Sequence, residues 1–117
     1  MEPAPVLSHA RLDVYRCAIE FLAVTTRIRE ALPRGSADIA DQLRRASLSV
    51  PLNVAEGAGK TSTAEKRKYY AIARGSALEC AAILDVCVVL GIVDSPAIQP
   101  ANALLARIVG MLTKMTR

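Results

Sequence analysis

Apolar residues recur at intervals of three and four along four segments of this chain, and this periodicity constrains the fold more than any other feature. The segments cover residues 8–32, 36–57, 62–90 and 94–115, with turn-forming residues between them. Short connections between amphipathic helices favour antiparallel neighbours. The sequence therefore predicts an all-α fold, an antiparallel up-and-down four-helix bundle over residues 8–117, preceded by a flexible, proline-bearing arm over residues 1–7.

Each predicted helix carries a stripe of residues that we expect to face a shared core. In the first helix the stripe comprises Leu12, Tyr15, Ile19, Leu22 and Thr26, widened by Phe21, Val24 and Ile28. In the second it comprises Ile39, Leu43, Ala46, Val50 and Val54. In the third it comprises Tyr69, Ile72, Ser76, Glu79, Ile83, Val86 and Leu90. In the fourth it comprises Ile98, Leu105, Ile108, Leu112 and Met115.

Residues with helix-end preferences mark several boundaries. Ser36 is a suitable N-cap for the second helix, and Ser62 with Glu65 forms a capping box that opens the third. Asp94 or Ser95 is the expected cap of the fourth helix. The β-branched run at residues 86–89 is also compatible with a buried strand, although the chain offers no second strand to pair with it.

The second segment contains an internal proline, Pro51, which removes one backbone donor and predicts a kink. Other apolar side chains of the middle two helices fall opposite the predicted stripes, namely Leu48, Leu52, Leu78 and Val89. Leaving each of these in water would forgo about 1.5–3 kcal/mol. The mean hydropathy of +0.28 is also high for a soluble monomer of this length. We therefore expect copies of the chain to cover these side chains in a homo-oligomer.

Size and composition bound the class of protein. The 117 residues suit one domain, and the longest apolar run, residues 86–93, is shorter than the ~18 residues of a membrane span. Residues 1–5 lack the features of a secretory signal, so we expect a cytoplasmic protein without membrane association. The three cysteines are expected to be reduced, because Cys80 and Cys87 lie roughly 10 Å apart along one predicted helix.

The sequence offers no complete catalytic or metal motif. The stretch at residues 57–62 is similar to the end of a phosphate-binding loop, but Val54 stands where the first glycine of that loop belongs. A hydrolytic triad needs a histidine base, and the single histidine, His9, has no suitable partners nearby in the sequence. Zinc-binding spacings and Glu-x-x-His pairs are absent from the sequence. We therefore predict no catalytic residues, no metal and no cofactor.

Polar residues also interrupt the apolar middle helices. A buried carboxylate such as Glu79 needs hydrogen bonds, an arginine partner such as Arg44 or Arg45, or a proton. We expect a structural polar network that fixes helix register and subunit orientation, comprising Asn53, Glu56, Ser76 and Glu79. A ligand site at the same place is the alternative.

Positive charge is concentrated in the middle of the chain. Residues 44–74 hold seven Lys or Arg against two acids, a net of +5, while the remaining eight basic and nine acidic residues nearly cancel. Such a cluster suits contacts to nucleic-acid phosphates, although charge runs are often only solvated. The candidate nucleic-acid-binding residues are Arg44, Arg45, Lys60, Lys66, Arg67, Lys68 and Arg74.

Several motifs resemble those of the bacterial four-helix bundle proteins first noticed in intervening sequences of 23S ribosomal RNA genes. The resemblance is carried by residues 42–46, 50–57, 75–79, 90–92 and 107–112, and it covers nearly everything from Leu12 to the C-terminus. It implies a homopentamer and a kinship with the accessory variability determinant of diversity-generating retroelements, a basic pentameric barrel that binds nucleic acid and a reverse transcriptase. Lys60 stands where the family usually has arginine, and the resemblance supplies no catalytic residue.

Two functions from different classes follow. The first is a non-enzymatic, oligomeric bundle that binds structured RNA or DNA through its basic surface. The second is a protein-interaction scaffold without a nucleic-acid role. An enzyme would have to rely on Glu79 and Asn53 alone.

Overall fold

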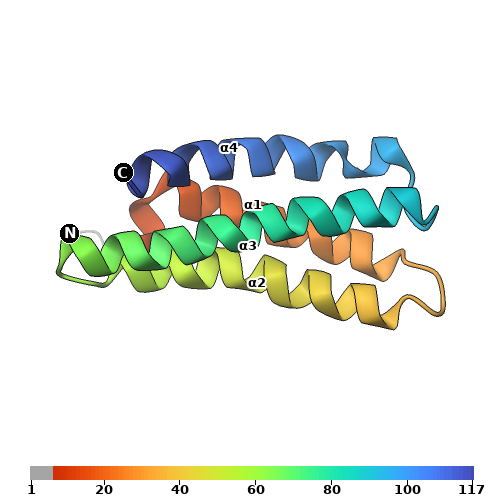
Figure 1. Ribbon diagram of the computed structural model, residues 1–117, viewed down its shortest axis with the longest axis horizontal. Helices are drawn as coiled ribbons and strands as arrows, with labels where there is room; N and C mark the ends of the chain where they lie inside the picture. The colour runs from red at the N-terminus through yellow and green to blue at the C-terminus, as the bar shows by residue number, and fades with distance from the viewer. Residues whose placement is uncertain (1–6) are drawn as a thin grey trace, which may run out of the picture.

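The computed structural model describes residues 7–117 as four antiparallel α-helices arranged as an up-and-down bundle (Figure 1). The α-helices are α1 (Asp13–Glu30), α2 (Ala37–Ala58), α3 (Thr63–Val89) and α4 (Gln99–Met115), and short 3-10 helices η1 (Ser8–Arg11) and η2 (Ser95–Ile98) precede α1 and α4. The predicted all-α bundle is confirmed, and residues 7–117 contain no strand. Most of the arm expected over residues 1–7 lies outside the described residues.

The helix ends follow the capping chemistry in part. The Oγ of Ser62 accepts a hydrogen bond from the backbone N–H of Glu65 at 3.1 Å, as the capping box predicts. Gly91, which follows the C-cap residue Leu90 of α3, has a φ of +71°, a conformation that glycine adopts without strain. The fourth helix differs from the prediction, because residues 95–98 form the 3-10 turn η2 before the α-helical geometry begins at Gln99.

The stripes predicted for the second and fourth helices are correct. Leu43, Ala46, Val50 and Val54 are buried in α2, and Ile98, Leu105, Ile108 and Leu112 are buried in η2 and α4. The core is therefore aliphatic, with Phe21 of α1 as its one fully buried aromatic ring among the described residues.

The stripe predicted for the first helix is correct in part, because Phe21 and Ile28 are buried while the other predicted residues are half-buried or exposed. The residues of α1 that are buried are Val14, Cys17, Ala18, Phe21, Thr25 and Ile28. Ile19, which the prediction placed in the core, is exposed. Small residues cause the error, because Cys17 and Ala18 let neighbouring helices approach α1 closely while the larger Ile19 lies outside.

The stripe predicted for the third helix is largely wrong, and small residues are again the reason. The buried residues of α3 are Tyr70, Ala73, Ala77, Cys80, Ile83, Leu84 and Cys87. Ile72, Val86 and Leu90 are exposed, and Ile83 alone belongs to both stripes. Because α3 is apolar on several sides, its periodicity does not identify the inner face, and its alanines and cysteines turn inward where the packing is tightest.

The backbone is α-helical at both places where the sequence predicted a kink or allowed a strand. Pro51 is buried within α2, and the helix continues through it to Ala58. Residues 86–89 are the last turn of α3, so the strand alternative is wrong. Cys17, Cys80 and Cys87 are all free and buried, as expected for reduced packing residues. Burial raises the pKa of Cys80 to about 12 and also raises that of Cys87.

Candidate nucleic-acid interface

The connection between α2 and α3, residues 59–62, lies at the same end of the bundle as the start of α1 and the C-terminus (Figure 1). We call this the hairpin end. It carries four of the seven predicted nucleic-acid-binding residues, Lys60, Lys66, Arg67 and Lys68. Arg67 and Lys68 are exposed, whereas Lys60 and Lys66 are half-buried.

Lys66 is engaged within the fold. Its Nζ donates hydrogen bonds to the backbone carbonyls of Gly57 at 3.3 Å and Ala58 at 3.1 Å. These carbonyls belong to the last turn of α2, where helices have unpaired acceptors and a partial negative charge. The ammonium group therefore caps α2 from the neighbouring helix, and Lys66 is a weaker candidate for phosphate contacts than its sequence position indicates.

Lys60 and Lys68 lie against one aromatic ring. Their Nζ atoms are 5.2 Å and 5.6 Å from the centroid of the Tyr69 ring, within the range of cation–π attraction. Tyr69 itself is half-buried. Two of the positive charges at the hairpin end are thus grouped around a single partly exposed ring.

The other three predicted contacts lie further along α2 and α3 from the connection. Arg44 and Arg45 are exposed on α2, roughly 20 Å from residue 59 along the helix axis. Arg45 Nε forms an ion pair with Asp41 Oδ2 at 3.3 Å, as the i,i+4 spacing allows. Arg74 Nε donates to Thr113 Oγ1 of α4 at 2.9 Å. The seven residues therefore do not form one continuous patch on a single chain.

The bundle topology brings further positive charge to the hairpin end. Lys114 lies in the last turn of α4, and Arg117 follows that helix. The sequence does not group them with residues 44–74, because they are far from those residues along the chain. The half of the bundle at the hairpin end, residues 7–21, 48–76 and 108–117, holds nine Lys or Arg against four acids, a net of +5. The other half, residues 22–47 and 77–107, holds six of each and is neutral. The charge is thus distributed unequally along the bundle axis.

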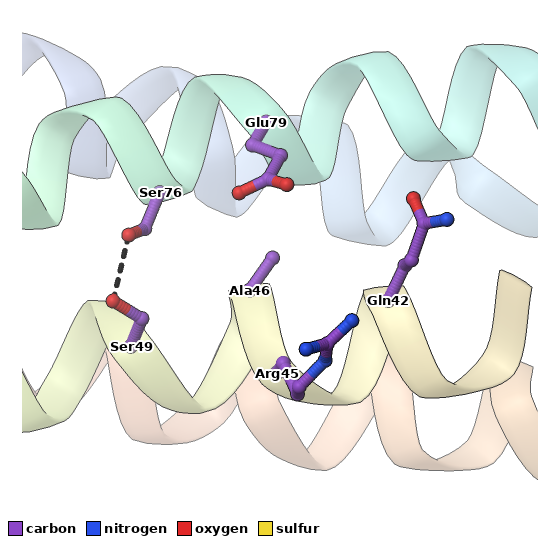
Figure 2. Close-up of a pocket in the computed structure, with 6 residues that line it drawn as sticks. All are labelled: Gln42, Arg45, Ala46, Ser49, Ser76 and Glu79. Carbon is purple, nitrogen blue, oxygen red and sulfur yellow. Dashed lines mark hydrogen bonds between the residues drawn. The ribbon is translucent and has the colours of Figure 1, made fainter. Parts of the chain in front are cut away.

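A polar groove of about 320 Å³ runs between α2 and α3, lined by Gln42, Arg45, Ala46, Ser49, Ser76 and Glu79 (Figure 2). The hydroxyls of Ser49 and Ser76 share a hydrogen bond of 2.7 Å across the two helices. Asn53 Nδ2 donates to the hydroxyl of Ser49 at 2.9 Å and to its backbone carbonyl at 2.8 Å. Ser49, which the sequence did not single out, therefore links Asn53 to Ser76.

The two glutamates of the predicted network form no hydrogen bond with this trio. Glu79 is exposed and lines the groove, and Glu56 is exposed on α2. The expectation that Glu79 is buried is wrong, because small residues of α3 occupy the core in its place. Arg45, its expected partner, is paired with Asp41 instead.

Several large apolar side chains remain in contact with solvent in the single chain. Leu52 is 63% exposed, Leu78 44% and Val89 85%, whereas Leu48 is half-buried. Leu78 also lines an apolar groove of about 310 Å³ between α3 and α4. The bundle thus presents apolar surface on the outside of its middle two helices.

Two other classes of site are absent from residues 7–117. This part of the chain holds no cluster of three or more His, Cys, Asp or Glu side chains arranged to bind a metal ion. None of its helices combines the length and the apolar character that crossing a bilayer requires.

Comparison with known proteins agrees with the fold and the motifs. The family model of the 23S rRNA-intervening sequence protein matches residues 10–114. A comparison with curated proteins found no match. Because the family match spans all four helices, the chain belongs to the 23S rRNA-intervening sequence protein family.

Proposed function

We propose that this protein is a non-enzymatic, oligomeric bundle that binds structured RNA or DNA through backbone phosphates at its hairpin end. The observation that carries this proposal is the net charge of +5 in the hairpin half of the bundle against zero in the other half. Phosphate contacts by Lys and Arg dominate nucleic-acid affinity without requiring base readout. The exposed side chains of Arg67 and Lys68 are the main contacts, and Lys60, Lys114 and Arg117 lie at the same end of the bundle.

Self-assembly strengthens this proposal. The exposed side chains of Leu52, Leu78 and Val89 support a contact with other copies, since complete burial of an exposed apolar side chain contributes about 1.5–3 kcal/mol and each would gain the share that is now exposed. The resemblance to pentameric relatives favours a ring of five. Repeating a weak basic site in such a ring raises the avidity for a long polyanion without new contacts in any single subunit.

A matched pair of double variants tests the proposal. Arg67→Glu with Lys68→Glu reverses two exposed charges at the hairpin end, and Arg27→Glu with Arg34→Glu reverses two exposed charges at the opposite end. Both pairs change the net charge equally, so a general loss of attraction affects them alike. We expect a gel shift of structured RNA or DNA to be lost in the first pair and retained in the second. Equal retention in both pairs would refute phosphate binding at the hairpin end.

A protein-interaction scaffold is the second candidate. The apolar groove lined by Leu78, Ala81 and Val109 favours it, because such a surface fits a protein partner better than phosphate. A reverse transcriptase is one such partner implied by the family resemblance. If the protein is such a scaffold, we expect no affinity for nucleic acid at low salt. We also expect partner binding to be lost when Leu78 is replaced by Glu.

A further inference from the structure

The Tyr69 ring is the most distinctive group at the hairpin end. Lys60 reaches it from the α2–α3 connection and Lys68 from the preceding position in α3, with Nζ-to-centroid distances of 5.2 Å and 5.6 Å. The ring is half-buried, so part of its surface remains open to solvent. An aromatic surface and two cations are therefore held together on one short stretch of chain.

The Cβ and backbone of Tyr69 are held in place by the packing of α2 against α3. A Cβ placed on Gly57 would lie 3.2 Å from the Cβ of Tyr69, so the two helices approach each other at this point with little free space. The Lys66 ammonium ties the same region together by bonding to the Gly57 and Ala58 carbonyls. These contacts hold the backbone at Tyr69, while the partly exposed ring lies near the ammonium groups of Lys60 and Lys68.

The other described aromatic rings are occupied differently. Phe21 is fully buried, and Tyr70 is almost fully buried, which raises the pKa of its hydroxyl. Tyr15 packs edge-to-face against His9, with ring centroids 4.7 Å apart. Among residues 7–117, Tyr69 is therefore the phenol ring that combines partial exposure with neighbouring cations.

We propose that Tyr69 is a stacking site for an unpaired nucleobase, with Lys60 and Lys68 contacting the phosphates on either side of that base. Every base offers a π-face to an aromatic side chain, and neighbouring cations bind the backbone. In the free protein the two ammonium groups lie near the ring, and a bound strand replaces this contact with base stacking and ion pairs. The inference rests on the proposed nucleic-acid binding and adds that the ligand contains single-stranded segments, such as loops or bulges.

Binding to duplex and to single-stranded ligands distinguishes phosphate binding at the hairpin end from base stacking on Tyr69. Bases inside a duplex are stacked on each other and cannot cover Tyr69, whereas the phosphates of both ligands remain accessible. Stacking therefore contributes to the affinity for a single strand alone. Phosphate binding contributes to both affinities.

The test measures binding of three labelled ligands of about 20 nucleotides, by fluorescence anisotropy at about 50 mM salt: oligothymidylate, an abasic strand of equal length, and a duplex. We expect Tyr69→Leu to weaken oligothymidylate binding about tenfold and to leave the abasic strand and the duplex within about twofold of wild type. Tyr69→Phe keeps the ring and should bind oligothymidylate like wild type. The wild-type protein should prefer oligothymidylate to the abasic strand about tenfold, a comparison that needs no variant.

Intrinsic fluorescence gives an independent readout, because the chain contains three tyrosines and no tryptophan. Oligothymidylate should quench tyrosine emission in the wild type, and Tyr69→Leu should lose most of that quenching. Equal affinity of the wild type for oligothymidylate and the abasic strand would overturn the stacking proposal and leave phosphate binding intact. Absence of binding to all three ligands would overturn both.

Discussion

Gly57 of α2 lies so close to Tyr70 of α3 that a Cβ on the glycine would be 2.7 Å from Cε1 of the tyrosine ring. This contact closes the hairpin end, places the buried Tyr70 under the α2 terminus and positions Tyr69 next to it. The absence of a side chain at position 57 therefore lets α2 approach α3 closely beside Tyr69, whose ring lies near Lys60 and Lys68.

Gly57→Ala should reduce the free energy of unfolding by about 1–3 kcal/mol, because the added methyl group overlaps a buried ring. Gly75→Ala is the matched control, since nothing lies within 4 Å of a Cβ at that helical position. The control should be neutral or stabilise by up to about 1 kcal/mol. Urea denaturation followed by circular dichroism measures both. Equal stability of the two variants would show that the approach is not tight.

Lys66→Ala should show whether Lys66 caps the end of α2 or contacts nucleic acid. Loss of the two hydrogen bonds to the α2 carbonyls should cost about 1 kcal/mol of stability, whereas Lys68→Ala, which lacks those bonds, should cost less than about 0.5 kcal/mol. We expect the reverse order for nucleic-acid affinity, measured by anisotropy on the same proteins. A Lys66 variant with full stability and the larger loss of affinity would assign Lys66 to phosphate instead.

The hydroxyl pair of Ser49 and Ser76 should show coupling in a double-mutant cycle. Replacing either serine with alanine leaves the other half-buried hydroxyl short of one partner, and replacing both removes that mismatch. We expect a coupling free energy of about 0.5–1.5 kcal/mol from thermal or urea unfolding. A coupling indistinguishable from zero would mean that this bond does not contribute to the register of α2 and α3.

The buried thiols should make stability depend on alkaline pH. Burial, with a smaller contribution from the Glu79 charge, raises the pKa of Cys80 from 9.0 to about 12 in the folded protein. The folded protein holds this proton more tightly than the unfolded chain, so the stabilisation is full below pH 9 and is lost as the pH rises towards 12. Cys80→Ala should show a smaller decline in unfolding free energy above pH 9. At pH 8 all three thiols should resist iodoacetamide until the protein is denatured.

The apolar surface of the middle helices predicts self-association. Sedimentation velocity at micromolar concentration should show a particle several times larger than 12.5 kDa. Leu52→Glu or Val89→Glu should weaken that assembly at least tenfold, because a charge would enter the buried contact. Ala103→Glu, at an exposed position of α4, is the control and should leave the assembly unchanged. A lone 12.5 kDa particle would contradict self-association.

The sequence predicts the helices and most of their ends because capping residues and turn glycines act locally, as Ser62 and Gly91 show. It predicts the inner faces less well. On α3 the larger apolar residues, such as Val86, lie outside, and the small Ala77 and Cys80 lie inside, a choice made by neighbouring helices. Hydropathy alone cannot make that distinction.

Contacts between residues that are far apart in the sequence could not be predicted from local patterns either. Ser49 reaches Ser76 across 27 residues of chain, and Arg74 reaches Thr113 across 39. The composition of residues 44–74 reveals the excess of basic residues. The separation of these residues between the hairpin end and the surface of α2 follows only from their positions along the helices of the bundle. Once the up-and-down topology is known, Lys114 and Arg117 could be assigned to the hairpin end from sequence.

Binding at the hairpin end is tested most directly by the salt dependence of RNA affinity in the wild type and the two charge-reversal pairs. Counterion release makes the logarithm of the association constant fall linearly with the logarithm of the salt concentration, with a slope set by the number of phosphate contacts. We predict a negative slope in the wild type, a shallower one after Arg67→Glu with Lys68→Glu, and an unchanged one after Arg27→Glu with Arg34→Glu. Affinity that does not weaken as salt rises, or slopes that are the same in all three proteins, would contradict phosphate binding at the hairpin end.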